Sequence, residues 1–137
     1  IRQKLMVAIE NVLPLPRQGK TFLLFLPEGE HHELGLLFVY YLLKSRGARI
    51  IYLGSNVPLA DVEHIITLKK PDFAYIHLTA TCPNFNFDRF LQFAGQRFGG
   101  TPTIVSGYLT QQYKKQLPGN VSFKYSLAEV MEALHTV

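Results

Sequence analysis

The sequence has few cysteines, little charge and no long apolar run, and each shortage excludes a class of protein. Its single cysteine, Cys82, cannot form an internal disulfide, which argues against a disulfide-stabilised secreted domain. No apolar run reaches the roughly 20 residues of a membrane span. The first residues also lack the pattern of a signal peptide. We therefore expect a cytoplasmic protein with no membrane partner.

The phosphate-binding glycine motifs of common α/β proteins are also missing. No Gly-x-Gly-x-x-Gly and no Gly-x-x-x-x-Gly-Lys-Ser/Thr follows a predicted strand, which argues against dinucleotide and P-loop nucleotide binding. A receiver domain would need an aspartate at the end of the third predicted strand, where this sequence has Leu78 and Thr79. A flavodoxin-like phosphate loop is not expected after the first strand, because that loop is acidic and would repel phosphate.

Basic residues outnumber acidic ones but form no nucleic-acid-binding pattern. The formal net charge is +4 and the isoelectric point is near 9.3. Lysines and arginines are scattered, and there is no helix-turn-helix, zinc finger or stripe of alternating aromatic and basic residues. We therefore do not expect this chain itself to bind DNA.

What the sequence does contain is a regular alternation of strand-like and helix-like segments. Its 137 residues, 47% hydrophobic and 18% charged, suffice for one folded domain. Five alternations with short connections predict an α/β fold: a doubly wound, mainly parallel, five-stranded sheet, Rossmann-like or flavodoxin-like, of order 2-1-3-4-5. The predicted strands are residues 21–26, 49–53, 73–78, 103–106 and 121–124. The predicted helices are residues 1–13, 32–45, 59–69, 87–98, 110–116 and 127–135.

The first predicted helix reads as the end of a preceding segment. Residues 1–13 carry a helical apolar stripe without a capping residue at its start, and Pro14 and Pro16 follow as a stiff linker. We therefore divide the chain into residues 1–16, a preceding helix and linker, and residues 17–137, the α/β domain. The helix at 32–45 is apolar nearly all round, so the preceding helix or a second subunit is expected to cover one of its faces.

Ligands of doubly wound sheets bind beyond the carboxyl ends of the strands. In this sequence that edge is formed by residues 27–32, 54–58, 79–83 and 106–109. The first of these loops is acidic and ends in two histidines, which suits a cation.

A neutral imidazole can bind a transition metal through one ring nitrogen while a carboxylate holds the other. His32 is the candidate metal ligand, and Glu30, two residues earlier, is its candidate partner. Two alternatives stay open on the residues alone. The histidines could be polar residues at a helix start, or they could join the acidic side chains Glu28, Glu30 and Glu33 in a zinc or manganese site.

These residues resemble three signatures of cobalamin-binding domains. Glu30-His31-His32-Glu33-Leu34-Gly35 resembles the Asp/Glu-x-His-x-x-Gly motif, in which the histidine replaces benzimidazole as the lower cobalt ligand. Thr79-Ala80-Thr81 resembles the Ser/Thr-rich segment after the third strand. Ser106-Gly107 stands where the family has Gly-Gly after the fourth strand. The order and place of all three match the predicted sheet edge.

The resemblance covers about residue 20 to the end of the chain and is greatest to the cobalamin domains of MerR-type transcriptional regulators. These include the light-sensing repressors that use adenosylcobalamin. By that resemblance His32 is the axial cobalt ligand, Glu30 is its partner, and His31 faces solvent. The resemblance also implies that four residues line the groove for the displaced nucleotide tail and that two others lie nearby. The groove residues are Thr79, Thr81, Ser106 and Gly107, and the neighbours are Gly54 and Tyr108. Gly35, which ends the histidine motif, is also among the expected cofactor-binding residues.

The resemblance implies a sensing module and not an enzyme. Residues 1–16 would then end a helical bundle that caps the corrinoid, DNA would be bound by a domain outside this chain, and the cofactor would stabilise a homo-oligomer. The chain has no tryptophan, so an aromatic cap over the upper corrinoid face would have to lie upstream or be absent. The alternatives are a corrinoid carrier domain of a methyltransferase or mutase and a cofactor-free interaction domain that kept the fold.

Overall fold

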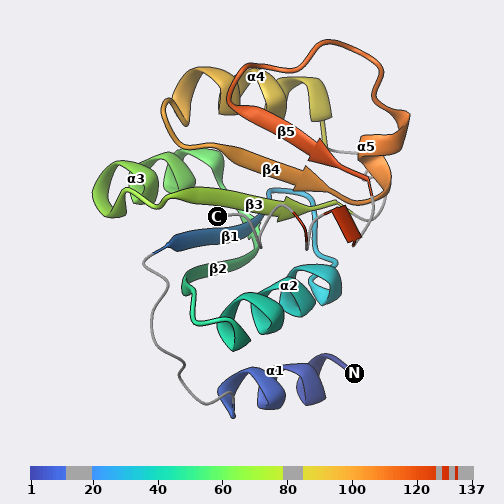
Figure 1. Ribbon diagram of the computed structural model, residues 1–137. Coiled ribbons are helices and arrows are strands. Elements are labelled where there is room, and N and C mark those ends of the chain that lie inside the picture. Colours follow the sequence, from blue (N-terminus) through green and yellow to red (C-terminus); the bar gives the residue numbers. More distant parts are fainter. Residues whose placement is uncertain (12–19, 79–84, 126–127, 130–131, 133–137) are drawn as a thin grey trace.

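The computed structural model describes residues 1–11, 20–78, 85–125, 128–129 and 132 (Figure 1). Strands and helices alternate along these ranges. The strands are β1 (Thr21–Pro27), β2 (Arg49–Val57), β3 (Phe73–His77), β4 (Thr103–Ser106) and β5 (Val121–Lys124). The helices are α1 (Arg2–Glu10), α2 (Leu34–Ser45), α3 (Leu59–Lys69), α4 (Phe87–Arg97) and α5 (Tyr108–Gln112). None of these helices has both the length and the apolar character that a bilayer crossing requires.

The five strands form one parallel sheet in the order β2-β1-β3-β4-β5. This confirms the predicted fold class, strand number and strand order. The sequence encodes the arrangement because the inner strands are buried on both faces and read as continuous apolar runs. In β1, every residue from Phe22 to Pro27 is buried.

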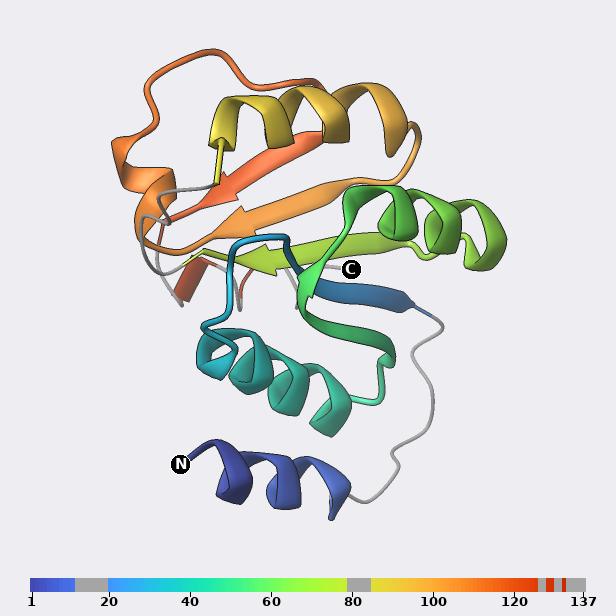
Figure 2. The same ribbon diagram turned by 180° about the vertical axis from the view of Figure 1, so that it is seen from behind.

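Each face of the sheet has its own apolar core. Alternate β1 side chains point to opposite faces, so Phe22 and Leu24 pack with α2 while Leu23 and Phe25 pack with α3 and α4. Figure 2 shows α2 on one side of the sheet, and α3 and α4 on the other. The carboxyl ends of all five strands therefore meet at one edge, between these two layers.

Helix α1 lies along α2 on the side away from the sheet (Figures 1 and 2). The ammonium group of Lys44, near the end of α2, donates to the carbonyl oxygen of Ile9 at 2.8 Å. At the other end of α1, Arg2 pairs with Glu33 at 3.3 Å. The expectation that the preceding helix covers the apolar helix is thus confirmed, although Phe38 of α2 stays 40% exposed.

The start of α2 was predicted two residues too early. The helix begins at Leu34 with Glu33 as its N-cap, and its first backbone bond runs from the Leu37 N–H to the Glu33 carbonyl oxygen at 2.8 Å. His32 is kept out of the helix because its backbone N–H donates to the side chain of Glu30. Both histidines therefore belong to the loop.

The second strand is longer than predicted. The sequence Gly54-Ser55-Asn56 reads as a turn, yet β2 continues through it to Val57. Gly54 and Asn56 adopt positive φ angles of 88° and 55°, and the pairing with β1 shifts register at this point. The turn-forming residues create an irregularity within the strand and do not end it.

The remaining differences lie at element ends. Helix α5 begins at Tyr108, directly after Gly107, and ends at Gln112, so the predicted range of 110–116 was displaced. Gly107 has a φ of 106° and turns the chain at once, which leaves no room for the longer loop expected. Strands β4 and β5 and helix α3 have the predicted bounds. Most of the predicted helix at 127–135 lies outside the described residues.

Candidate functional site: a histidine loop beside an apolar cavity

The loop after β1 is organised by one buried carboxylate. Glu30 is only 2% exposed, and its Oε1 accepts the backbone N–H of His32 at 3.0 Å. The same oxygen lies 3.0 Å from Nδ1 of the His32 ring. The imidazole itself is 71% exposed. A buried group thus fixes the orientation of a side chain that projects from the protein.

This contact determines which ring nitrogen of His32 is free. A carboxylate only accepts hydrogen bonds, so the neutral ring must carry its proton on Nδ1 to donate to Glu30. The other nitrogen, Nε2, then has an unshared electron pair directed away from Glu30. The carboxylate also fixes the orientation of the ring, as such partners of metal-binding histidines commonly do. The pair therefore presents a fixed, solvent-accessible nitrogen ligand. His31 is exposed as well.

The irregular segment of β2 holds the loop from the other side. The N–H of Gly29 donates to the Asn56 side-chain oxygen at 3.0 Å, and the N–H of Asn56 donates to the Glu30 carbonyl oxygen at 3.1 Å. Asn56 makes both contacts from a left-handed backbone conformation, which asparagine tolerates better than most residues. The longer β2 thus has a positional role in the site.

Glu33, the residue after His32, connects α1 to the sheet. Its carboxylate accepts from the Tyr52 hydroxyl at 2.6 Å and from the Ser55 hydroxyl at 3.3 Å, and it pairs with Arg2 of α1. Burial, together with this hydrogen bond, raises the pKa of Tyr52 far above its ordinary value. The tyrosine therefore stays a neutral donor to Glu33.

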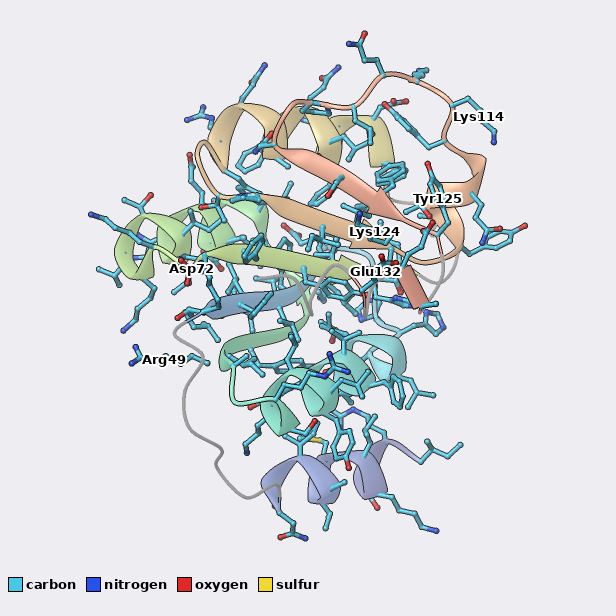
Figure 3. All side chains as sticks on the ribbon, viewed as in Figure 1. Arg49, Asp72, Lys114, Lys124, Tyr125 and Glu132 are labelled. Atoms are coloured by element: carbon cyan, nitrogen blue, oxygen red, sulfur yellow. The ribbon has the colours of Figure 1, made fainter. Side chains whose placement is uncertain are left out.

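A cavity of about 840 Å³ lies between α1, α2 and the carboxyl edge of the sheet. Its walls come from α1, the first half of α2, the ends of β3 and β4, α5, and the residues at and after the end of β5. Figure 3 shows the labelled Lys124 and Tyr125 at that end of β5, opposite the end of the sheet where Arg49 and Asp72 lie. The lining is mostly apolar. Leu34 and Gly35 belong to the cavity wall, so His32 lies two residues before the first wall residue of α2.

Three polar side chains are grouped in this apolar wall. Tyr75 and His77 lie two residues apart on β3, and Ser106 is the residue of β4 that pairs with His77. The Tyr75 hydroxyl is hydrogen-bonded to Ser106 Oγ, which lies 2.9 Å from His77 Nδ1. Burial raises the pKa of Tyr75 to about 12 although the bond to Ser106 opposes the rise. Burial lowers the pKa of His77, against the opposing effect of the Glu30 charge.

Two glycines at the cavity wall are required by close packing within the chain. A Cβ atom on Gly35 would lie 2.4 Å from Cδ2 of His77. A Cβ atom on Gly107 would lie 2.1 Å from the Leu78 carbonyl oxygen, and its φ of 106° also favours glycine. Gly35 thus admits the His77 ring beside α2, and Gly107 lets the chain turn against the end of β3.

The structure brings most of the predicted site residues to one edge of the sheet. Glu30 and His32 form the loop contact, whereas Gly35, Ser106, Gly107 and Tyr108 line the cavity. Gly54 lies apart from the cavity, in the irregular segment of β2. Thr79 and Thr81 lie outside the described residues. The ligand roles given to all of these residues stay predictions.

Sequence reasoning missed Tyr75, His77 and the role of Asn56. His77 was recognisable in principle, because it is a titratable residue at the carboxyl end of the central strand. Asn56 was read as a turn residue because nothing local shows that β2 continues beside the histidine loop.

The alternative of a multi-ligand zinc or manganese site gains no support. Within the described ranges, no group of three or more histidine, cysteine, aspartate or glutamate side chains is placed to hold a metal ion. A metal at His32 would therefore need its other ligands from elsewhere, as cobalt in a corrinoid has them from the macrocycle.

Two curated relatives match most of the chain. It is 29% identical over 117 residues to the HTH-type transcriptional repressor CarA of Myxococcus xanthus, covering 85% of this chain and 40% of the repressor. It is 29% identical over 110 residues to the HTH-type transcriptional repressor CarH of the same organism, covering 80% of this chain and 36% of the repressor. The chain is similar to transcriptional repressors. These matches confirm the resemblance predicted from the sequence. The chain spans about two fifths of the length of these relatives.

Solved structures give the same fold. The Methanosarcina barkeri monomethylamine corrinoid protein superposes with a TM-score of 0.65 at 14% identity, covering 98% of this chain and 63% of that chain. This likeness supports a common Rossmann-like architecture. No family model matches the chain.

Proposed function

We propose that this chain is the cobalamin-binding sensory domain of a MerR-like transcriptional regulator, with His32 as the lower axial cobalt ligand. The observation that carries the proposal is the pair of Glu30 and His32 beside the cavity. A buried carboxylate fixes an exposed imidazole, and a large apolar cavity begins two residues further along the chain.

His32 suits cobalt because only one nitrogen ligand has to come from the protein. Four equatorial positions of a corrinoid cobalt are filled by the macrocycle, so an isolated, correctly oriented imidazole is sufficient. The Nε2 atom of His32 is available for this role, because Nδ1 is held by Glu30. Adenosylcobalamin is the proposed form, and His31 is proposed to stay in solvent.

The cavity suits the nucleotide tail that leaves cobalt when a protein histidine takes its place. The tail is a largely apolar ring system joined to a sugar and a phosphate, and the cavity is apolar with two lysines, Lys4 and Lys124, in its wall. Ser106, Gly107 and Tyr108 are proposed to contact this tail, with Gly35 beside it. Thr79 and Thr81 keep the same proposed role, and Gly54 is proposed to support the histidine loop from β2.

The regulatory part of the proposal rests on the curated relatives and on α1. The two relatives are named as transcriptional repressors, and this chain matches only part of each. DNA binding is proposed for a domain outside this chain. Helix α1 forms a wall of the cavity and is proposed to end a helical bundle that covers the corrinoid. A bound corrinoid would supply a cobalt centre whose upper ligand is sensitive to light or exchange.

A corrinoid carrier domain of a methyltransferase or mutase is the second candidate, and the shared fold with a corrinoid protein favours it. In that case the same histidine would tune the cobalt, and a partner protein would bring the substrate. A helix-turn-helix upstream of this chain in the full-length protein would favour the transcriptional regulator over the carrier domain. No residue of this chain is proposed to be catalytic under either reading.

Retention of the cofactor tests the proposal. The full-length protein is mixed with adenosylcobalamin in the dark, desalted, and measured by visible spectroscopy and gel filtration before and after illumination. We expect a retained corrinoid spectrum and an oligomer larger than that of the apoprotein. His32→Ala should lose the bound spectrum, whereas His31→Ala is the matched control and should keep it. No retained corrinoid in the wild-type protein would overturn the proposal, and an oligomer unchanged by light would remove photoreception alone.

A further inference from the structure

The polar group formed by Tyr75, Ser106 and His77 is unexpected in the wall of a mostly apolar cavity. Tyr75 is fully buried and Ser106 is 2% exposed, so their hydroxyl groups depend on protein partners. Buried polar groups are costly to leave without a hydrogen bond, so the three hydrogens of this group must be placed where acceptors exist.

Every proton arrangement that satisfies the group makes Nδ1 of His77 an acceptor, because the Tyr75 hydroxyl also lies 3.4 Å from that nitrogen. If Tyr75 donates to Ser106 and Ser106 donates to His77 Nδ1, both hydroxyl hydrogens have an acceptor. If His77 instead carries its proton on Nδ1, that proton occupies the contact with Ser106. One of the two hydroxyl hydrogens then has no acceptor among the described residues. Whether the hydrogen on Nδ1 of His77 comes from Ser106 or from Tyr75, the ring nitrogen itself carries no proton.

A neutral histidine without a proton on Nδ1 carries it on Nε2. Burial lowers the pKa of His77, which agrees with a neutral ring. Nε2 has no hydrogen-bond partner among the described residues. The ring edge formed by Cδ2 and Nε2 lies against Gly35, and both residues line the cavity. His77 thus brings an N–H donor to the cavity wall, and the two hydroxyl groups behind the ring fix its tautomer.

We propose that His77 donates this N–H to the lower base of the bound corrinoid and so selects cobamides whose base has an acceptor nitrogen. This inference rests on the proposed function. When His32 takes the cobalt, a benzimidazole base releases its ring nitrogen, which becomes a hydrogen-bond acceptor. A phenolic base, as in cresolyl cobamide, has no ring nitrogen. Against such a base the N–H of His77 would stay unpaired, and a site that loses a hydrogen bond in this way discriminates strongly.

The test compares two cobamides that differ in the lower base. Dissociation constants are measured for the adenosyl forms of dimethylbenzimidazolyl and cresolyl cobamide, with the full-length wild-type protein and His77→Phe. The readout is the ratio of the two dissociation constants, compared between wild type and variant. Free benzimidazolyl cobamide must first release its own cobalt bond, and this cost is the same for both proteins and cancels. We expect His77→Phe to lower the preference for the benzimidazolyl form by about tenfold, the usual effect of one lost buried hydrogen bond. His64→Phe, on the exposed side of α3, should leave the preference unchanged.

A second measurement does not depend on a folded variant. In wild-type protein labelled with nitrogen-15, the Nε2–H resonance of His77 should shift downfield with the benzimidazolyl form and not with the cresolyl form. The inference would be overturned if a folded His77→Phe protein kept the wild-type preference. It would also be overturned if the Nε2–H resonance were the same with both cobamides. Either result would leave the proposed function intact. If neither cobamide is retained by wild-type protein, both fail together.

Discussion

Oε1 of Glu30 accepts both the backbone N–H and the ring Nδ1–H of His32, each at 3.0 Å. One buried oxygen thus fixes the main chain and the side chain of the same residue. The ring cannot rotate without losing this contact, and the loop cannot join α2 without losing the backbone bond. The histidine is therefore oriented before any ligand arrives.

Removing the charge of Glu30 should weaken corrinoid binding. In Glu30→Gln the shape of the side chain is kept, but an amide can both donate and accept, so it no longer fixes the tautomer of His32. Loss of such a partner typically lowers metal affinity by about 10- to 100-fold, and we expect a fall in that range by spectroscopic titration. Glu28→Gln makes the same chemical change at an exposed position of the loop and is the control. Equal affinities in the two variants would show that Glu30 has no role in binding.

Asn56 should contribute through its backbone conformation as well as its side chain. Asn56→Gly loses the bond to Gly29 but accepts the positive φ of 55°. Asn56→Ala loses the bond and also adopts a left-handed conformation that costs a residue with a Cβ about 1 to 2 kcal/mol. We therefore expect the alanine variant to be the less stable by about 1 kcal/mol in urea unfolding. A glycine variant that is no more stable than the alanine variant would contradict this account.

Gly35→Ala should destabilise the protein although alanine is the better helix former by about 1 kcal/mol. The new methyl group would meet the His77 ring at 2.4 Å, and overpacking of this kind costs about 1 to 3 kcal/mol. In a His77→Ala background the ring is gone, so adding Gly35→Ala should no longer lower the free energy of unfolding. Gly100→Ala, with open space around it, is the control. A Gly35→Ala protein as stable as wild type would refute the clash.

Stability should fall as the pH drops below neutrality, in part because of His77. Burial lowers the folded-state pKa of His77 below its ordinary value of 6.5, and Glu30 is the charged group that opposes this. The unfolded chain therefore binds more protons once the pH passes below that ordinary value. The free energy of unfolding decreases from there until the folded-state pKa is reached.

The slope is measured by urea unfolding between about pH 7 and about pH 5. His77→Gln should show a shallower fall than wild type, because it removes the titrating group. His64→Gln removes an exposed histidine from α3 and controls for the loss of a histidine elsewhere. Identical slopes for His77→Gln and wild type would contradict the buried, neutral histidine.

The fold could be predicted because each strand and helix is recognisable from its own stretch of sequence. Each inner strand is a continuous apolar run, as in β1, and short connections leave few topologies for such an alternation. The contact between Glu30 and His32 was also predictable, since the two residues are neighbours in one loop. It is present in the structure, while the role of His32 as a ligand stays a prediction.

The unpredicted parts depend on contacts between distant segments. His77 joins the cavity wall because β3 pairs with β4 in a register that sets it opposite Ser106. Asn56 reaches the histidine loop only because β2 continues past its expected turn. Neither relationship follows from spacing along the chain, because strand register and bulges are set by pairing between strands.

Electron paramagnetic resonance of the cobalt(II) form most directly tests whether His32 binds cobalt. The full-length protein is loaded with cobalamin, reduced by one electron, and compared with the same protein labelled with nitrogen-15 in its histidines. We expect the axial nitrogen splitting to change from a triplet to a doublet on labelling, and the doublet to be lost in His32→Ala. A triplet that persists in the labelled protein would show that cobalt keeps its own benzimidazole, and this would contradict the account.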